Sequence, residues 1–326
     1  MPNKYLNKKG IEIKKQRYKI SNWAEYNEAL CQRGRVDIWL SQEAIDQWYE
    51  PDRSFTGEGT PQLYTDLAII TCHEIRQVFK LPLRQTEGFI NSLFGILNLS
   101  LRCPDYTTLS IRLKQLGIKS PRYKKTDRPD EDLMAIAIDS TGLKRYGRGE
   151  WHQEKHKVSA KRSWRTLHIG VDNKHIIHAS VMTDRFVNDD QVVEDLLNQI
   201  DCPVNQFTGD GAYDKNPVYE LLSTHSAAAE IIIPPDSDAK YDVNKNHAQR
   251  SQNTFECQAY GRMAWQRQRQ YGNRNYSELG MKRYKEILGN KLHAREIDRQ
   301  KQETMIGCGV LNKMTNLGMP QSHRVT

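Results

Sequence analysis

The chain has 326 residues, with 48 lysines and arginines against 40 aspartates and glutamates, so its formal net charge is +8. Only 37% of the residues are hydrophobic, and no stretch approaches the roughly 18 consecutive apolar residues of a membrane-spanning helix, which excludes an integral membrane protein of that kind. The start of the chain lacks the apolar run of a signal peptide, so we expect a cytoplasmic protein. The six cysteines lie at least 31 residues apart, which excludes a zinc ribbon and a small disulfide scaffold.

Basic residues gather in three blocks along the chain. Residues 1–20 hold seven basic and one acidic side chain, residues 144–165 hold eight and two, and residues 262–301 hold eleven and four. Three separated blocks of one sign favour a polyanionic partner such as nucleic acid. For any single block, a solvated charged surface is the alternative.

The first part of the chain reads as a basic arm followed by helices. Residues 1–36 show little apolar periodicity, whereas residues 37–117 show helical spacing. We expect one helix from about 66 to 80 and a second from about 84 to 99. A short third helix would span 108–116.

The short third helix has its own start and stop signals. Asp105 or Thr107 can cap its start, and Gly117 can end it. Helix, turn and short capped helix are typical of a helix-turn-helix, in which Arg112 and Lys114 would point outward to DNA. An ordinary helical hairpin has nearly the same pattern.

After a linker at 118–130 the hydrophobic pattern changes from helical to alternating. The order of elements predicts an α/β fold, with a mixed five-stranded sheet and helices on both faces. The expected strands are 133–138, 164–171, 175–182, 206–208 and 230–233, and the expected helices are 189–200, 216–224, 255–265 and 276–288. Residues 236–253 read as a polar loop.

Two acidic residues stand out by their position. Asp139 follows an apolar run and so lies at the end of a buried strand, and Asp210 follows another strand between two glycines. Carboxylates at such places are costly unless they bind cations, and two on adjacent strands suit a hard divalent ion. Asp214 is a rival to Asp210, but it looks more like the N-cap of the next helix.

Four residues near the C-terminal end would share one face of a helix. Measured from Glu278 at about 100° per residue, Tyr271, Arg274 and Lys285 all fall within about 40°. One carboxylate flanked by two cations suits a surface that meets both a metal and phosphates. The alternative is an exposed face with ordinary ion pairs four residues apart.

These residues reproduce the spacing Y-(2)-R-(3)-E-(6)-K, and the chain resembles bacterial insertion-sequence transposases of the DDE type that carry it. Further matching stretches are IDSTGLKRYGRGEW around Asp139, GDGAYD around Asp210, EIIIPP, VLNKMTNLGMP, LRQTEGFINSLF and CPDYTTLS. The resemblance covers roughly residues 60–320. One departure is Asp236-Ser237-Asp238, where a basic residue is expected, and it argues against DNA contact by that loop.

The resemblance implies a ribonuclease-H-like catalytic domain. Asp139, Asp210 and Glu278 would hold two Mg²⁺ ions, for which Mn²⁺ can substitute. Arg274 and Lys285 would neutralise phosphates, and Tyr271 would pack on or bond to the DNA end.

The implied domain limits follow the changes of pattern. They are a basic arm at 1–36, a helical DNA-end-binding domain with its linker at 37–130, the catalytic domain at 131–315 and a tail at 316–326.

The implied function is that of a DNA transposase acting on the nucleoid. It would bind the terminal inverted repeats of its own element, cleave them and join the ends to target DNA, as a homo-oligomer in the synaptic complex. The alternatives are a metal-dependent nuclease that does not join strands, and a DNA-binding relic that no longer catalyses.

Other candidates are weighed against this assignment. Glu256 and Glu286 are rivals for the third carboxylate, but they lack cations on the same helix face. Basic residues of the loop after Asp139 are expected to follow DNA phosphates; they are Lys144, Arg145, Arg148, Lys155, Lys157, Lys161 and Arg162. The pair His152 and His156 has the spacing of a zinc pair but no evident third ligand. His175, His178 and Trp265 read as structural residues.

Overall fold

The computed structural model describes residues 17–51, 61–122, 134–145 and 164–325. The chain forms two compact units, one of Met1–Ile38 with Met314–Thr326 and one of Trp39–Lys313. This division does not test the predicted domain limits, which stay predictions. Within the described ranges, no helix has the length and apolar character needed to cross a membrane.

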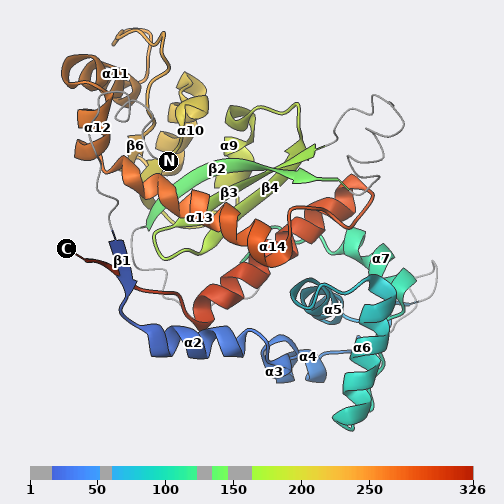
Figure 1. Ribbon diagram of the computed structural model, residues 1–326. Helices are drawn as coiled ribbons and strands as arrows, with labels where there is room; N and C mark the ends of the chain where they lie inside the picture. The colour runs from blue at the N-terminus through green and yellow to red at the C-terminus, as the bar shows by residue number, and fades with distance from the viewer. Residues whose placement is uncertain (1–16, 52–60, 123–133, 146–163, 326) are drawn as a thin grey trace, which may run out of the picture. The chain divides into compact units, whose positions relative to one another are not determined.

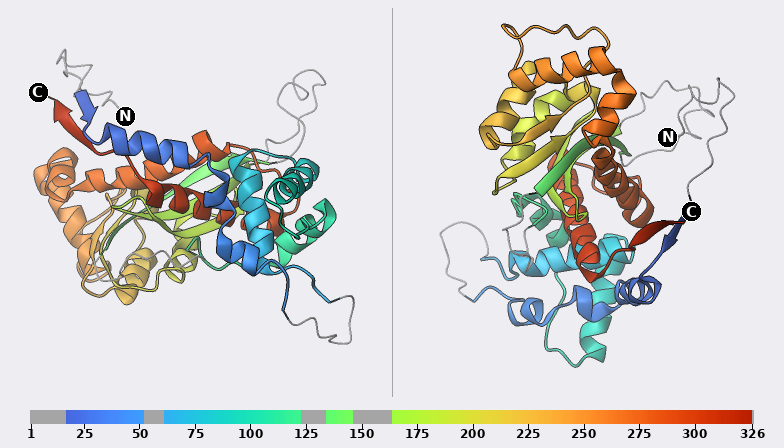
Figure 2. Two further views of the ribbon diagram at one scale, coloured as in Figure 1. Left: turned by 90° about the horizontal axis from the view of Figure 1, so that it is seen from below. Right: turned by 90° about the vertical axis from the view of Figure 1, so that its left-hand side faces the viewer.

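The smaller unit joins the two ends of the chain. Strand β1 (Arg17–Ile20) pairs antiparallel with β7 (Ser322–Val325), and helix α2 (Trp23–Gln32) follows β1. The blue and dark red strands lie side by side in both views of Figure 2. The Asn22 side chain donates to the Met319 carbonyl at 3.1 Å and accepts from the Gln321 amide at 2.7 Å. Local periodicity missed this strand, because its pairing partner lies at the other end of the chain.

The larger unit begins with helices, as predicted. They are α3 (Val36–Trp39, shared with the smaller unit), α4 (Gln42–Asp46), α5 (Asp66–Val78), α6 (Leu83–Ile96) and α7 (Tyr106–Gln115). The Asp105 side chain caps α7 by accepting from the amides of Thr107 and Thr108, both at 2.9 Å. The blue-green helices α5–α7 form one group in Figure 2. A helix-turn-helix role for this group stays a prediction.

The expectation that Arg112 points outward is wrong. Its side chain is buried, and its guanidinium donates to Asp66 Oδ1 at 2.7 Å and to the Tyr64 carbonyl at 2.8 Å. The reason is its spacing, because Arg112 lies three residues after Leu109 and therefore on the buried face of α7. Lys114 does lie on the surface, with its ammonium 3.5 Å from Asp298 Oδ2.

A mixed five-stranded sheet forms the centre of the larger unit, as predicted. The strands are β2 (Met134–Lys144), β3 (Trp164–Asp172), β4 (Ile177–Asp184), β5 (Val204–Thr208) and β6 (Glu230–Ile232). Their order is β4-β3-β2-β5-β6, with β2, β3 and β4 antiparallel and β2, β5 and β6 parallel. This order and these directions fit a ribonuclease-H-like fold.

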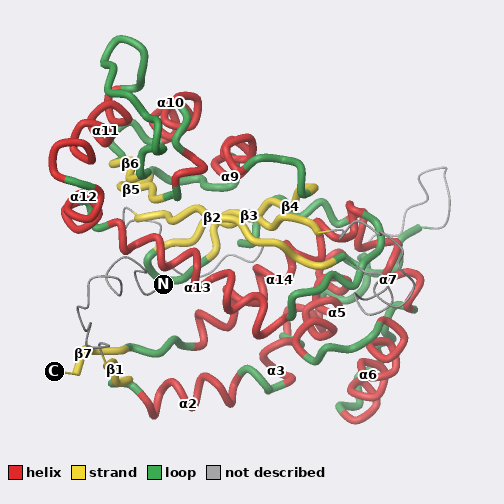
Figure 3. The backbone as a smooth tube through the Cα atoms, turned by 45° about the horizontal axis from the view of Figure 1, so that its top comes forward, coloured by secondary structure: helices red, strands yellow, loops and turns green. Residues whose placement is uncertain are grey.

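Helices cover both faces of the sheet (Figures 1 and 3). One face packs on α9 (Val193–Leu197), which follows the short helix η1 (Asp189–Val192), and on α10 (Asn216–His225), through a core that includes Ile136, Phe207 and Leu222. The other face packs on α13 (Asn275–Arg283) and α14 (Ile297–Leu317).

Asp139 lies on the face that α13 covers. A Cβ at Gly280 of α13 would lie 3.2 Å from Ile169 of β3, and Ile169 pairs directly with Asp139 across the ladder. Paired residues of neighbouring strands project to the same face. The carboxylate of Asp139 is therefore directed toward the helix that carries Glu278.

Two helical predictions need correction. The expected helix at 255–265 is two helices, α11 (Ala248–Tyr260) and α12 (Arg262–Gln268), and the polar loop ends where α11 begins. They separate at Gly261, whose φ of +83° favours glycine and cannot continue a helix. The expected helix at 276–288 is α13 followed by a π-helical turn, η4 (Tyr284–Leu288).

Two glycine-to-alanine substitutions test the packing between α14 and η4. A Cβ at Gly307 would lie 2.9 Å from Tyr284 Cε2 and 3.0 Å from Leu288 Cδ1, whereas a Cβ at Gly88 of α6 meets nothing within 4 Å. Gly307→Ala should lower the free energy of unfolding by about 1–3 kcal/mol through overpacking. Gly88→Ala should raise it by about 0.5–1 kcal/mol through helix propensity. Urea unfolding measures both, and a gain for Gly307→Ala would contradict the packing.

Candidate functional site

The sheet register brings Asp139 and Asp210 together. Ala137 of β2 pairs with Thr208 of β5 in a parallel ladder, and each aspartate lies two residues further along its own segment. Asp139 does not end its strand, contrary to the sequence prediction, because β2 continues alongside β3 as far as Lys144. Asp210 does follow the end of its strand.

Local structure holds the Asp210 carboxylate in place. Asp210 is the N-cap of the short helix η2 (Gly211–Tyr213) and accepts a hydrogen bond from the Ala212 amide at 2.9 Å. A Cβ at Gly209 would lie 3.0 Å from the Tyr213 ring, so this ring packs over a position that only glycine fits without strain.

Arg274 joins two of the predicted catalytic carboxylates. Its Nη1 lies 2.9 Å from Glu278 Oε1, and its Nη2 lies 3.2 Å from Asp139 Oδ2. Arg274 closes the short helix η3 (Tyr271–Arg274) and begins α13, so Glu278 lies one turn further on. The side-chain amide of Asn273 donates to Gln206 Oε1 at 2.8 Å and thereby ties η3 to β5.

Burial and neighbouring charges shift the ionisation of this pair. Asp139 is 8% exposed, and burial raises the pKa of its carboxyl; the Ser140 amide and Arg274 lower it, and Asp210 raises it further. Burial lowers the pKa of Arg274, but Asp139, Tyr271 and the other nearby acidic groups outweigh that effect and raise it. The site therefore holds negative charge that Arg274 only partly compensates.

Tyr271 and Lys285 were also predicted to share the helix face with Arg274 and Glu278, but both lie where the backbone departs from α-helical geometry. Tyr271 lies in η3, with its ring centroid 5.9 Å from that of the buried Trp265, and burial is the main cause of its raised pKa. Lys285 lies in the π turn η4 and is partly exposed. A single α-helix from 271 to 285 was therefore the wrong assumption, although the contact between Arg274 and Glu278 agrees with it.

The rival carboxylates have other partners. Glu256 is 8% exposed and binds Arg269, whose Nε lies 2.9 Å from Oε2. Glu286 is exposed, and Lys282 lies 3.8 Å from it.

Asp214 is fully buried, and its carboxylate lies 2.8 Å from Arg250 Nε. It is not the expected N-cap of α10, since Lys215 holds that position. The same carboxylate accepts from the Asp236 amide at 2.9 Å, so Asp214 ties the loop after β6 to η2.

The structure adds two residues that sequence reasoning missed. The buried Tyr213 hydroxyl has no hydrogen-bond partner among the described residues, and burial together with Asp189, Asp139 and Asp210 raises its pKa. Asp189 lies 3.3 Å from His168 Nδ1. Asp189 also forms a side-chain hydrogen bond with Ser140 of β2. The sequence around Asp189 reads only as the start of a helix, and no local pattern shows this approach to β2.

The fit of a divalent cation can be judged from these groups. The oxygen donors of Asp139 and Asp210 suit Mg²⁺, and the partnerless buried Tyr213 hydroxyl beside them is typical of a site that takes an additional polar group. In the part of the chain that the structure describes, no three acidic, histidine or cysteine side chains converge as a preformed metal site. The Arg274 guanidinium lies between Asp139 and Glu278.

The predicted DNA contacts of the loop after β2 are described only in part. The Lys144 ammonium lies 5.6 Å from the centroid of the Trp164 ring. Desolvation raises the pKa of Asp184, but hydrogen bonds from Arg165 and the Arg185 backbone amide lower it overall, and the charge of Arg145 adds a smaller lowering effect. Arg148, the other basic residues of that loop and the pair His152 and His156 lie outside the described residues.

The residues expected to be structural can also be placed. His178 is buried and lies 3.0 Å from Asp172 Oδ2, and Trp265 is fully buried with its indole directed to Asn253. His175 lies in the turn before β4 with φ of +65°, not on the strand.

Two family models, both described as a transposase DDE domain, match the chain, one over residues 31–148 and one over residues 130–313. The chain belongs to the DDE transposases. The second match covers more than half of the chain and includes Asp139, Asp210 and Glu278. The chain is also remotely similar to piggyBac transposase in a cryo-EM structure of its synaptic complex with hairpin DNA, with 11% identity and a TM-score of 0.38 over 91% of this chain and 76% of that one.

Glu256 and Glu278 should differ in their effect on stability. Arg269 is the main cause of the lowered pKa of Glu256, so its ion pair stabilises the fold above the ordinary glutamate pKa and is lost as the pH falls through the lowered value. Glu256→Gln should cost about 2 kcal/mol at pH 7, and the difference from wild type should shrink at pH 3. Glu278→Gln should cost less than about 1 kcal/mol, since Glu278 is half exposed. Unfolding at both pH values checks this, and equal losses would contradict it.

Proposed function

We propose that this DDE transposase binds the terminal inverted repeats of its own insertion sequence, cleaves the DNA there and joins the ends to target DNA. The observation that carries the proposal is the grouping of Asp139, Asp210, Arg274 and Glu278 at one edge of the sheet. The spacing of Tyr271, Arg274, Glu278 and Lys285 supports the finer assignment to the Y-(2)-R-(3)-E-(6)-K branch of bacterial elements.

The proposed reaction is in-line displacement at phosphorus, in which water cuts the strand and a 3′-hydroxyl then attacks the target. Asp139, Asp210 and Glu278 are the residues that would hold two Mg²⁺ ions. When bound, these ions lower the pKa of the attacking group and stabilise the leaving oxygen. The burial of Asp139 supports this role, because its carboxylate lacks full compensation by the protein.

Arg274 has two roles in this proposal. Its guanidinium lies between Asp139 and Glu278 and compensates their charge. On DNA, the same planar fork binds phosphate oxygens, for which its geometry is well suited. Moving Arg274 from carboxylate to phosphate would leave Asp139 and Glu278 open to a divalent cation, so DNA binding and metal binding would favour each other.

Joining two ends requires two active sites, so we propose a homo-oligomer in the synaptic complex. Lys144, Arg145, Arg148, Lys114, Lys285 and Tyr271 are proposed to contact DNA, consistent with their basic or aromatic character. Arg112 is not proposed to contact DNA directly, because its guanidinium is bound to Asp66; its role is to hold α7 in place.

The decisive experiment uses conservative carboxylate variants. Asp139→Asn, Asp210→Asn and Glu278→Gln should each lower Mg²⁺-dependent cleavage and joining by at least about 1,000-fold while end binding stays within about threefold. Combining them should add little, because the three groups act as one unit. The matched control Glu286→Gln should retain activity. Near-normal cleavage by Glu278→Gln would contradict the assignment.

Strand joining separates this function from the alternative of a simple nuclease. Pre-cut ends with an exposed 3′-hydroxyl should be joined to a target plasmid in the presence of Mg²⁺, and EDTA should abolish the reaction. Nicking without any joined product would favour the nuclease. The end DNA for both assays is taken from the inverted repeats that flank the reading frame.

A further inference from the structure

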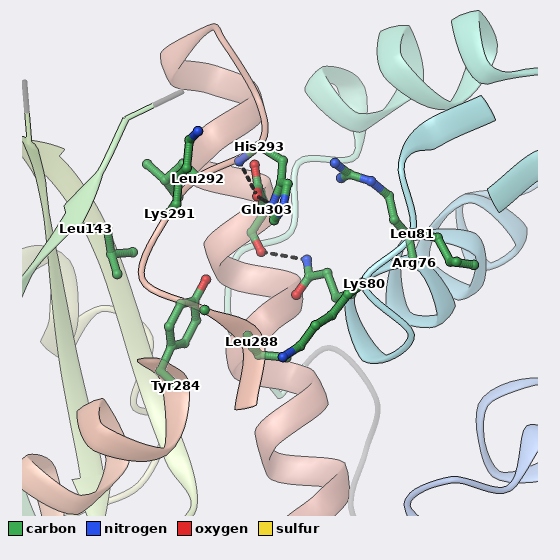
Figure 4. A pocket seen from close by; sticks show the side chains of 12 residues that line it. Arg76, Lys80, Leu81, Leu143, Tyr284, Leu288, Lys291, Leu292, His293 and Glu303 are labelled. Carbon is green, nitrogen blue, oxygen red and sulfur yellow. Dashed lines mark hydrogen bonds and ion pairs between the residues drawn. The ribbon is translucent and has the colours of Figure 1, made fainter. Parts of the chain in front are cut away.

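A second charged pocket lies in the larger unit, apart from the carboxylates. Its walls come from the end of α5, from Leu143 of β2, from the π turn η4 with the loop after it, and from Glu303 of α14. The pocket is partly open to solvent. In Figure 4, Arg76 and Lys80 approach it from one helix, and Lys291 and His293 come from the facing loop.

Among the described residues that line the pocket, the one carboxylate is that of Glu303, and it bonds the facing loop. Glu303 Oε1 accepts from the His293 amide at 2.8 Å and lies 3.1 Å from His293 Nδ1, and Oε2 accepts from the Ala294 amide at 2.7 Å. Glu303 is therefore used to hold the loop. From the facing helix end, Arg76 and Lys80 bring two positive charges to the pocket.

Arg76 is a buried cation that lacks a full set of partners. It is 7% exposed, and its Nε has no hydrogen-bond partner among the residues described. Burial lowers the pKa of this guanidinium, and only the charge of Glu303 opposes the effect. A buried guanidinium with an unused donor is costly, and an oxyanion with several acceptor oxygens would satisfy it.

Lys80 adds an observation on the backbone. It directly follows Phe79, the C-cap of α5, and has a φ of +55°. The Leu81 backbone amide donates to the Arg76 carbonyl at 2.9 Å. This is a Schellman motif, in which glycine is the usual residue because a side chain in that conformation costs energy. A lysine here is unfavourable for the fold, which is understandable if its ammonium binds a ligand.

We propose that this pocket binds a backbone phosphate of the DNA, at a distance from the bond that is cut. Leu143 lies four residues beyond Asp139 on the same strand, or about 13 Å away. Phosphates of one DNA strand recur about every 3.4 Å along the helix axis, so a distance of about 13 Å places the bound phosphate no more than about four nucleotides from the cleaved bond. This inference rests on the proposed function, since it takes DNA as the source of the phosphate.

The test combines protein variants with neutral phosphates in the DNA. End DNA with a single methylphosphonate is scanned from about two to six nucleotides on either side of the cut. Wild type should lose roughly three- to tenfold in affinity at one position, and the double variant Lys80→Gly with Lys291→Ala should lose nothing further there. The double variant should also lower the slope of log affinity against log salt by about one for each phosphate contact removed. Lys245→Ala, an exposed lysine before α11, is the control and should behave as wild type.

Lys80→Gly keeps the proposal falsifiable if other variants unfold. Because glycine suits the backbone at this position, the melting temperature should stay the same or rise while end affinity falls. A variant that binds ends as tightly as wild type would overturn the proposal, as would equal sensitivity of wild type and double variant to the methylphosphonate.

Two further outcomes separate the possible failures. If inorganic phosphate stabilises wild type and not the double variant while no methylphosphonate matters, the pocket takes a free anion and the DNA assignment is overturned. If wild type cleaves charged ends normally but no position is sensitive, the pocket proposal alone fails. If wild type neither binds nor cleaves the ends, the proposed function fails as well.

Discussion

The site depends on one guanidinium that bonds two carboxylates from different elements. Arg274 lies 3.2 Å from Asp139 of the sheet and 2.9 Å from Glu278 of α13. The pair with the half-exposed Glu278 adds little to stability, so this contact matters more for the position of Glu278 than for folding energy. It places the carboxylate of Glu278 on the helix beside that of Asp139 on the strand.

Charge of both signs is distributed in a way that suits a reaction of DNA. The chain carries a net charge of +8, yet Asp139, Asp210 and Asp189 all raise the pKa of the buried Tyr213 at the edge of the sheet. A basic surface attracts the polyanion, and an acidic centre attracts the cation that its phosphates need. In our proposal, Arg274 exchanges its carboxylate partners for phosphates when DNA binds.

The sequence predicted most of the elements that carry the site. Alternation and apolar runs located the five strands, and the glycines around Asp210 marked a turn at the end of β5. The β1–β7 pair, the inward direction of Arg112 and the approach of Asp189 to Tyr213 were missed. All three depend on partners distant in the sequence, which local periodicity does not report. The change from η3 to α13 to η4 was also missed, because a face calculated at about 100° per residue assumes an unbroken α-helix.

The most direct measurement of the central claim is Mn²⁺ binding to the free protein, followed by electron paramagnetic resonance. If Arg274 compensates Asp139 and Glu278 in the place of a cation, Arg274→Gln should bind Mn²⁺ at least about tenfold more tightly than wild type, or about 1.4 kcal/mol. The gain should vanish when Asp139→Asn or Glu278→Gln is added, and uncleavable end DNA should raise the affinity of wild type but hardly that of Arg274→Gln. Equal or weaker Mn²⁺ binding by Arg274→Gln would contradict the account.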